Sequence, residues 1–293
     1  TAEDLYQFHF VSTPEISHGG DEVVYVDKTV EQDEHKKYFS HLWMVETDGE
    51  SEPRQLTHGK SKNFSPKWSP DDSHIAFISD RNDEVPQIYL LPRDGGEAKQ
   101  LTELDRGEIS ELVWSPDGTK IAIVYAKSTA PTDEDGNPEE RVARRITKKW
   151  YKIQGKGFID DEYGQIYIVN VETGETTQLT DTAYNHKSLS WMPGSDAVVF
   201  GANPTEFEQY DINEERIYIQ RLDENSATEI PKQEEGPAVM PQVSPDGKTI
   251  AYVGHTDPEE AWGAAHNHLW LVPADGSDPP KNVNPDFGRT IGN

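Results

Sequence analysis

The apolar and polar positions of this chain alternate in short blocks, and the clearest block runs from residue 112 to residue 124. Residues 112–114 (Leu-Val-Trp) and 121–124 (Ile-Ala-Ile-Val) are apolar and aromatic, as buried strands favour. Between them the sequence Ser-Pro-Asp-Gly reverses the chain, because Pro116 cannot continue a strand ladder and Gly118 can adopt the positive φ of a tight hairpin. The pattern therefore predicts a β-hairpin.

A second hairpin is predicted about 40 residues later, over residues 165–180, where Gln-Ile-Tyr-Ile-Val leads through a Thr-Gly turn to Gln-Leu-Thr. Together the two hairpins predict a four-stranded antiparallel unit, and the unit recurs. Trp68 and Trp114, which occupy equivalent places, are about 46 residues apart. Four strands in a period of 40–50 residues are typical of a β-propeller. We expect five complete blades, at approximately 11–57, 64–102, 110–180, 187–231 and 238–284.

The fold class predicted is thus all-β, a single β-propeller domain over residues 1–293, with the tail from Asn284 beginning a sixth repeat. Five blades would leave a larger ring incomplete, with exposed strand edges that proteins usually avoid. We therefore expect the sequence to be a segment of a longer protein, and we expect self-association through open blade edges. The start at Thr1, without Met or a signal-like stretch, also indicates a processed or truncated chain.

The amino-acid composition restricts the classes of partner that the chain can bind. The 54 acidic and 27 basic side chains give a net charge of −27, which argues against nucleic acid and membrane as partners because both need a positive face. No apolar run approaches the roughly 18 residues of a membrane span. With no cysteine there is no thiolate chemistry or disulfide framework. The compartment is left open by this, and the cytoplasm is our working expectation.

No catalytic constellation is recognisable. A nucleophile elbow needs Gly-x-Ser-x-Gly, and the nearest stretches, 49–53 and 59–63, lack the second glycine. His255, His266 and His268 approach the spacing of metal ligands, but His268 begins a predicted strand. We predict no catalytic residue, no metal site and no cofactor in this chain.

The connections between the second and third strands of the blades are the variable ones, and we expect them on the face of the disc opposite the Ser-Pro-Asp-Gly turns. Long loops of varied sequence on one face of a rigid scaffold are typical of a binding surface. The longest, residues 126–164, holds an acidic stretch at 133–140 and a basic, aromatic stretch at 141–152 for which we expect an extra hairpin. Two interpretations stay open: the two stretches neutralise each other, or they contact a substrate or another domain.

The repeat motifs Trp-Ser-Pro-Asp-Gly, Ile-Ala-Phe, Ser-Asp-Arg, Ile-Tyr-Leu and Asp-Gly-Gly followed by Gln-Leu-Thr resemble those shared by TolB-like propellers and the propellers of the prolyl oligopeptidase family. Two stretches are similar to its acylaminoacyl-peptidase branch. They are the start, with Glu3-Asp-Leu-Tyr and Val11-Ser-Thr-Pro-Glu-Ile-Ser, and the third-blade insertion, with Arg144-Arg-Ile-Thr-Lys-Lys-Trp-Tyr-Lys and Gly157-Phe-Ile-Asp-Asp.

This resemblance implies a propeller, commonly of seven blades, over a C-terminal α/β-hydrolase domain that bears serine, aspartate and histidine. The propeller admits only short peptides to the cavity between the two. The chain would then be the non-catalytic, substrate-gating propeller of a serine peptidase, with that hydrolase domain and a short peptide as partners.

The substrate-facing candidates that follow from the resemblance lie in two loops. Arg144, Arg145, Trp150 and Tyr151 lie in the third-blade insertion. The related dipeptidyl peptidases bind the substrate amine with a Glu-Glu pair, which suggests Glu214 and Glu215, although the surrounding residues differ.

Two alternatives belong to other classes of protein. One is a stand-alone TolB-like propeller that serves as a protein-binding scaffold. The other is a propeller lyase that acts on acidic sugars with a histidine-bound metal.

Overall fold

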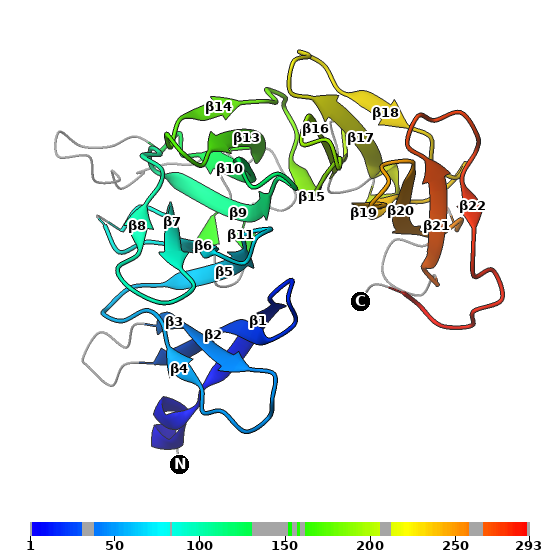
Figure 1. Cartoon of the computed structure of the whole chain (residues 1–293). Coiled ribbons are helices and arrows are strands. Elements are labelled where there is room, and N and C mark those ends of the chain that lie inside the picture. The colour runs from blue at the N-terminus through cyan, green and yellow to red at the C-terminus, as the bar shows by residue number, and fades with distance from the viewer. Residues whose placement is uncertain are drawn as a thin grey trace. The chain divides into compact units, whose positions relative to one another are not determined.

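The computed structural model describes residues 2–30, 38–82, 84–130, 152–153, 157–158, 162–205, 212–257 and 266–291. Within these residues the chain forms five four-stranded sheets (Figure 1). Neighbouring strands follow one another along the chain as antiparallel meanders, and in the third sheet a separate two-stranded sheet is inserted between the second and third strands. Helical structure among the described residues is limited to two 3-10 turns, η1 (Ala2–Gln7) and η2 (Ile212–Glu214).

The strands of the first two sheets follow directly from the predicted repeats. The first sheet consists of β1 (Phe10–Ile16), β2 (Glu22–Val30), β3 (Tyr38–Glu46) and β4 (Arg54–Gln55). The second consists of β5 (Asn63–Trp68), β6 (His74–Ser79), β7 (Gln87–Pro92) and β8 (Lys99–Gln100).

The third sheet contains the insertion. Its strands are β9 (Gly107–Trp114), β10 (Lys120–Lys127), β13 (Gln165–Asn170) and β14 (Thr176–Gln178). Inside the insertion, β11 (Lys152–Ile153) pairs antiparallel with β12 (Gly157–Phe158). A small hairpin therefore begins at the last residue of the basic, aromatic stretch; the other residues of that stretch lie outside the described part of the chain.

The last two sheets repeat the same order. The fourth contains β15 (His186–Trp191), β16 (Ala197–Ala202), β17 (Arg216–Arg221) and β18 (Thr228–Ile230). The fifth contains β19 (Val239–Val243), β20 (Thr249–Gly254), β21 (His268–Pro273) and β22 (Lys281–Asn282).

The chain divides into two compact units, residues 1–123 with 167–178 and residues 124–166 with 179–293. The first unit has a core in which two consecutive sheets meet: strands β2 and β3 contribute Val24 and Leu42, and the next sheet contributes Trp68, Ile75 and Phe77. The second unit has a corresponding core, in which Val199 and Ile217 meet Tyr252 and Trp270. Apolar side chains buried between neighbouring sheets make the main hydrophobic contribution to the stability of each unit.

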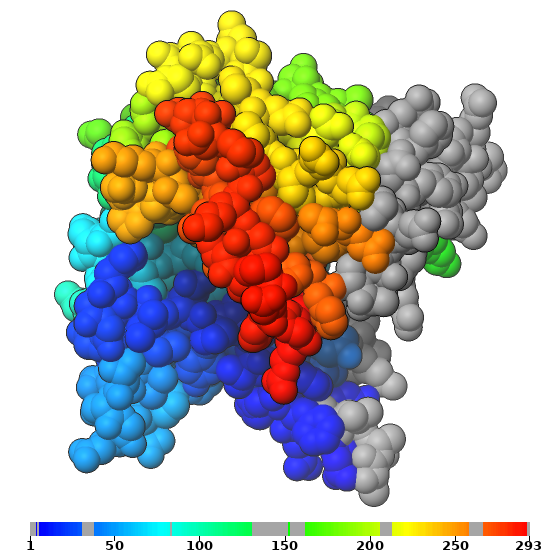
Figure 2. Space-filling model, turned by 90° about the vertical axis from the view of Figure 1, so that its right-hand side faces the viewer, coloured from blue at the N-terminus to red at the C-terminus, as the bar shows by residue number. Residues whose placement is uncertain are grey.

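The first strand of each later sheet contains at least one buried residue, whereas β1 contains none. Trp68 at the end of β5 is 5% exposed, whereas Ile16 at the same repeat position of β1 is 59% exposed, and Val11 is 64% exposed. The reason is that β5 lies against the preceding sheet, in the core described above, and no described sheet precedes β1 in the chain. The space-filling view shows residues of the N-terminal stretch, coloured deep blue, at the surface of the first unit (Figure 2).

A residue with left-handed backbone conformation recurs in the first strand of four sheets, β1, β5, β15 and β19. Thr13, Ser65, Ser188 and Met240 all have φ between 45° and 56°. In each of these strands the pairing with the next strand shifts register around that residue, so that each carries a β-bulge. Because the bulge recurs at the same repeat position, it is a feature of the repeat.

No helix in the described part of the chain has the length and apolar character needed to cross a bilayer.

Candidate functional site

The turns between the first and second strands are held by their own side chains. In the third sheet, Ser115 Oγ donates to Asp117 Oδ1 (2.6 Å) and accepts from the N–H of Lys120 (2.9 Å), while Gly118 has φ 70° as predicted. Burial alone would raise the pKa of Asp117, but hydrogen bonds from Ser115 and Thr119 outweigh it and lower that pKa to about 2.

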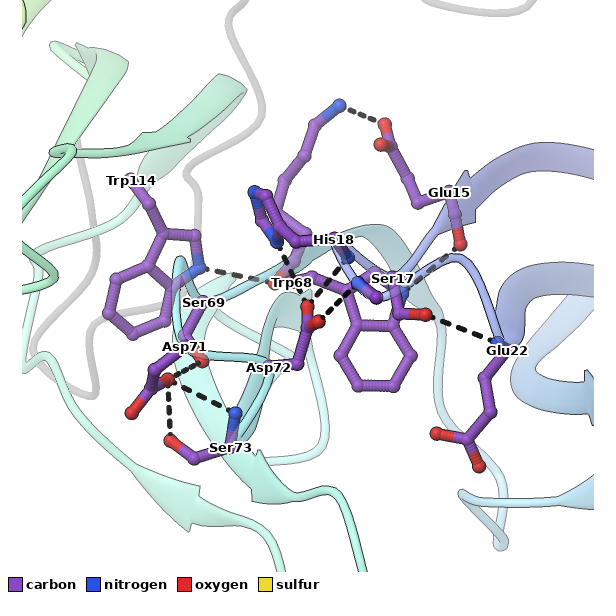
Figure 3. Close-up of polar contacts among 12 residues, drawn as sticks. Glu15, Ser17, His18, Glu22, Trp68, Ser69, Asp71, Asp72, Ser73 and Trp114 are labelled. Carbon is purple, nitrogen blue, oxygen red and sulfur yellow. Dashed lines mark hydrogen bonds and ion pairs between the residues drawn. The ribbon is translucent and has the colours of Figure 1, made fainter.

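The equivalent turn of the second sheet also contacts the first sheet (Figure 3). The carboxylate of Asp72 accepts hydrogen bonds from the backbone N–H of His18 (2.8 Å) and of Gly19 (2.8 Å), and lies 2.9 Å from His18 Nδ1. The indole N–H of Trp68 donates to the carbonyl of Glu15 (3.1 Å), and that of Trp114 donates in the same way to Lys67 (3.1 Å). This side of the first unit therefore joins neighbouring sheets.

Serine, histidine and aspartate lie close together here, but not in the order that nucleophilic catalysis requires. A catalytic serine donates to the histidine that activates it. Ser17 Oγ instead donates to Asp21 (2.8 Å) and accepts from the N–H of Glu22 (3.1 Å), while the ring of His18 faces Asp72. Among the described residues this cluster is an inter-sheet contact.

Glu214 and Glu215, predicted to face the substrate, contact different cations. Glu214 Oε2 lies 2.9 Å from the guanidinium of Arg216, and Arg216 also pairs with Glu229 (3.1 Å). Glu215 is 4% exposed, and its Oε2 lies 3.0 Å from Lys187 Nζ. Binding of one amine by both carboxylates would require these ion pairs to rearrange. The other four candidates, Arg144, Arg145, Trp150 and Tyr151, lie outside the described residues.

A pocket of about 470 Å³ lies in the second sheet, where the β6–β7 connection approaches the segment that follows β8. Its volume is within the range of small-molecule sites. Seven residues line it: Arg81, Asn82, Val85, Gln87, Gln100, Glu103 and Leu104.

Arg81 is the half-buried cation of this pocket. Its Nε donates to Ser79 Oγ (3.0 Å) and one terminal nitrogen donates to Asn63 Oδ1 (2.8 Å), so both acceptors are neutral. The guanidinium carbon lies 4.6 Å from the ring centroid of Tyr89 and 5.2 Å from that of Phe77, within the range of cation–π contacts. Burial lowers the pKa of Arg81, with Tyr89 and Glu97 opposing the effect. No carboxylate oxygen of the described residues lies within 4 Å of its nitrogens.

The amide side chains of the pocket are fixed by hydrogen bonds. Gln87 donates to the carbonyl of Leu104 (2.8 Å), and its oxygen accepts from the N–H of Leu104 (2.8 Å) and from Thr102 Oγ1 (2.8 Å). Gln100 Oε1 accepts from Asn82 (2.6 Å) and from the hydroxyl of Tyr89 (3.0 Å). The lining is therefore preorganised.

From the sequence alone, Arg81 is only the last residue of a Ser-Asp-Arg repeat motif. The sequence nevertheless distinguishes Arg81 from the equivalent residues of the other repeats. Nine residues after the left-handed turn residue, those repeats have Thr29, Lys127, Pro204 and Thr256. The repeat itself thus does not require an arginine there. Among the described residues no group of three or more histidine, aspartate or glutamate side chains could hold a metal ion.

Comparison with known proteins shows what this chain is similar to. Residues 7–148 match the family model described as the TolB beta propeller domain. The uncharacterized peptidase YuxL of Bacillus subtilis (strain 168) is 34% identical over 210 residues, which are 70% of this chain and 31% of that protein. Residues 7–148 therefore form a TolB-type propeller segment, and the chain is similar in sequence to peptidases. The predicted fold class and the predicted resemblance are both confirmed.

Two further similarities support this propeller assignment. Dipeptidyl-peptidase 5 of Porphyromonas endodontalis is 24% identical over 251 residues, which are 81% of the propeller chain and 36% of that protein. The crystal structure of the Pyrococcus horikoshii acylaminoacyl peptidase has a TM-score of 0.68 and 18% identity, and the match covers 99% of this chain and 42% of that one. At this identity the second comparison shows the fold alone. The propeller chain spans about a third of the length of these curated relatives.

Proposed function

We propose that this propeller is the non-catalytic, substrate-gating domain of a serine peptidase of the acylaminoacyl-peptidase type that acts on short peptides. The observation that carries the proposal is the 34% identity to a protein named as a peptidase over 70% of this chain. A catalytic serine, aspartate and histidine would be supplied by a C-terminal α/β-hydrolase domain of the same protein. The propeller would exclude polypeptides too large to pass it.

We place the gate on the loop face, which is the face formed by the connections between the second and third strands of the blades. The proposed substrate-facing residues stay Arg144, Arg145, Trp150 and Tyr151 in the insertion, with Glu214 at the end of η2 and Glu215 directly after it. The net charge of −27 disfavours nucleic acid and anionic membrane as partners. A cytoplasmic location also stays a prediction.

Self-association is the remaining proposed interaction, and the exposed β1 supports it. Val11 and Ile16 present apolar side chains at positions that are buried in β5, so a second copy or a further blade could cover them. Concentration-dependent sedimentation of the 293-residue chain tests the second-copy form of this proposal. A strictly monomeric chain would contradict it.

The experiment for the proposed function uses the product of the whole gene that encodes this chain. We expect that protein to react with a fluorophosphonate probe and to cleave acylated di- and tripeptide p-nitroanilides, with the rate falling steeply as the peptide is lengthened from 3 to about 30 residues. No labelling and no peptide cleavage would overturn the peptidase assignment. Equal cleavage of casein and short peptides would overturn the gating role alone.

A second candidate function is a TolB-like scaffold that binds a protein on its loop face, and the match of residues 7–148 to the TolB propeller model favours it. Under this alternative the gene product would not react with the probe, and a specific partner protein would protect the loop face from hydrogen exchange. The labelling experiment therefore separates the two functions.

A further inference from the structure

We propose that the pocket around Arg81 binds the terminal carboxylate of a short peptide. The peptide nature of the ligand rests on the proposed function, whereas binding of a carboxylate rests on the pocket itself. Neither the family match nor the repeat pattern assigns a ligand to this pocket.

The first argument is the charge that the pocket leaves uncompensated. Three other described arginines have close carboxylate partners: Arg93 pairs with Asp21 (2.6 Å), Arg216 with Glu214 (2.9 Å) and Arg221 with Asp196 (2.5 Å). Arg81 bonds instead to the neutral oxygens of Ser79 and Asn63, while Glu97 acts on it only at longer range and Glu103 lines the same pocket. A half-buried charge without a close counter-ion is costly, and a bound anion would lower that cost.

The second argument is the set of donors that remain. A guanidinium has five N–H donors in a planar fork, and two of them serve the bonds to Ser79 and Asn63. The bonds to Ser79 and Asn63 and the rings of Tyr89 and Phe77 fix the orientation of the plane. A fixed guanidinium with remaining donors is suited to a carboxylate, which it can bind in a bidentate manner.

The third argument concerns the other walls of the pocket. Val85 and Leu104 supply apolar surface, and Glu103 supplies a negative charge. Glu103 would repel a phosphate dianion more strongly than the single charge of a peptide's terminal carboxylate, which also lies next to apolar side chains. A volume of about 470 Å³ accommodates a ligand of that size.

The structure places this pocket beside the β6–β7 connection, which is one of the connections that we assign to the loop face. A propeller that receives short peptides would hold their carboxyl ends here. Arg81 is therefore proposed as a binding residue, with Gln87 and Gln100 as rigid walls.

The test is calorimetric titration of the 293-residue chain with N-acetyl-trialanine and with its C-terminal amide. We expect the acid to bind at least tenfold more tightly than the amide. Arg81→Gln should remove that preference, and Arg81→Lys, which keeps the charge but loses the fork, should retain part of it. The matched control is Arg221→Gln, which makes the same charge change at an exposed ion pair and should bind like the unaltered chain.

The outcomes are distinct. Equal binding of acid and amide, no binding at millimolar concentration, or an unchanged preference in Arg81→Gln would overturn the proposal. Inorganic phosphate binding as tightly as the acid would overturn the peptide assignment. If Arg81→Gln does not fold, the test uses the side-chain NMR signals of Gln87 and Gln100 in the unaltered chain. The proposal requires these signals to shift when the acid is added and not when the amide is added.

A peptidase assay of the whole gene product separates this proposal from the proposed function. Carboxylate binding without peptidase activity would support the pocket and contradict the gate. Peptidase activity without carboxylate binding would support the proposed function and contradict the proposal for the pocket.

Discussion

At the scale of single residues, the left-handed position of the hairpin turn shows how repeats differ. Glycine occupies it in three repeats, at Gly20, Gly118 and Gly247, with φ of 70–76°. Asp72 and Ser195 occupy it in the other two, with φ of 55° and 56°. A side chain in this region costs about 1 kcal/mol or more, although aspartate tolerates it better than most. At Asp72 the carboxylate offsets that cost by binding the first sheet.

Substitutions at Asp72 separate the strain from the contact. Asp72→Ala loses the hydrogen bonds from His18 and Gly19 and keeps the strain, so we expect a loss of about 2 kcal/mol in the free energy of unfolding. Asp72→Gly loses the same bonds but relieves the strain, and should be about 1 kcal/mol more stable than the alanine variant. Urea unfolding measures both. An alanine variant as stable as the original chain would show that the carboxylate contacts contribute nothing.

The Ser115–Asp117 turn predicts that the stability of the folded chain falls at acidic pH. Because the pKa of Asp117 is lowered to about 2 in the folded chain, its contribution to stability is complete above the unfolded pKa of about 4 and is lost as the pH falls from there to about 2. Ser115→Ala removes the donor to Asp117, so we expect a loss of about 1 kcal/mol at pH 7 that shrinks below pH 4. Urea unfolding at pH 7, 4 and 2.5 is the measurement.

The control for this acid dependence is Ser226→Ala, on an exposed loop, which should change stability little at any of the three pH values. If the effect of Ser115→Ala were the same at pH 7 and pH 2.5, the hydrogen bond to Asp117 would have no role in the dependence.

At the scale of elements, the burial of a strand depends on the strands and sheets that pack around it. Ile75 in β6 is fully buried in the core between the first two sheets, whereas Ile16 in β1 is 59% exposed. Both residues are isoleucines on strands of the same unit. Their difference in burial therefore reflects position in the array and not residue type.

This pair of isoleucines provides a matched test. Ile75→Ala should cost about 2–5 kcal/mol of unfolding free energy because it creates a cavity, and Ile16→Ala should cost less than about 1 kcal/mol because its side chain already meets water. Chemical denaturation at low protein concentration measures both. A large, concentration-dependent cost for Ile16→Ala would instead indicate that a second copy covers β1 in solution.

At the scale of the whole molecule, the net charge of −27 opposes compaction. Ion pairs such as those of Arg93 with Asp21 and Glu22 compensate only part of this charge. Screening by salt weakens repulsion between exposed carboxylates that lie about 10 Å apart. The ionic strength should therefore affect stability more than in a protein of balanced charge.

We expect the Tm of the 293-residue chain at pH 7 to rise by several degrees between about 20 mM and 500 mM NaCl. Near the sequence pI of about 4.6 the same change of salt should have little effect, because the net charge is then close to zero. Differential scanning calorimetry at both pH values is the measurement. A Tm that falls with salt at pH 7 would mean that attractive pairs outweigh the repulsion.

The sequence determined the features that depend on neighbouring residues. The alternation of apolar positions gave the strands, and the Ser-x-Asp-Gly turns gave the hairpins because Ser115, Asp117 and Gly118 make their contacts within five residues. The recurrence of these units was enough for the propeller prediction.

Only the tertiary structure decided which residues meet across long distances in the chain. Asp72 contacts His18 from 54 residues away, and the charge of Arg81 meets the rings of Phe77 and Tyr89 on two different strands. Glu214 and Glu215 are adjacent in sequence, yet they pair with different cations. Such contacts depend on strand register and on the packing of one sheet against the next, and local sequence patterns do not specify either.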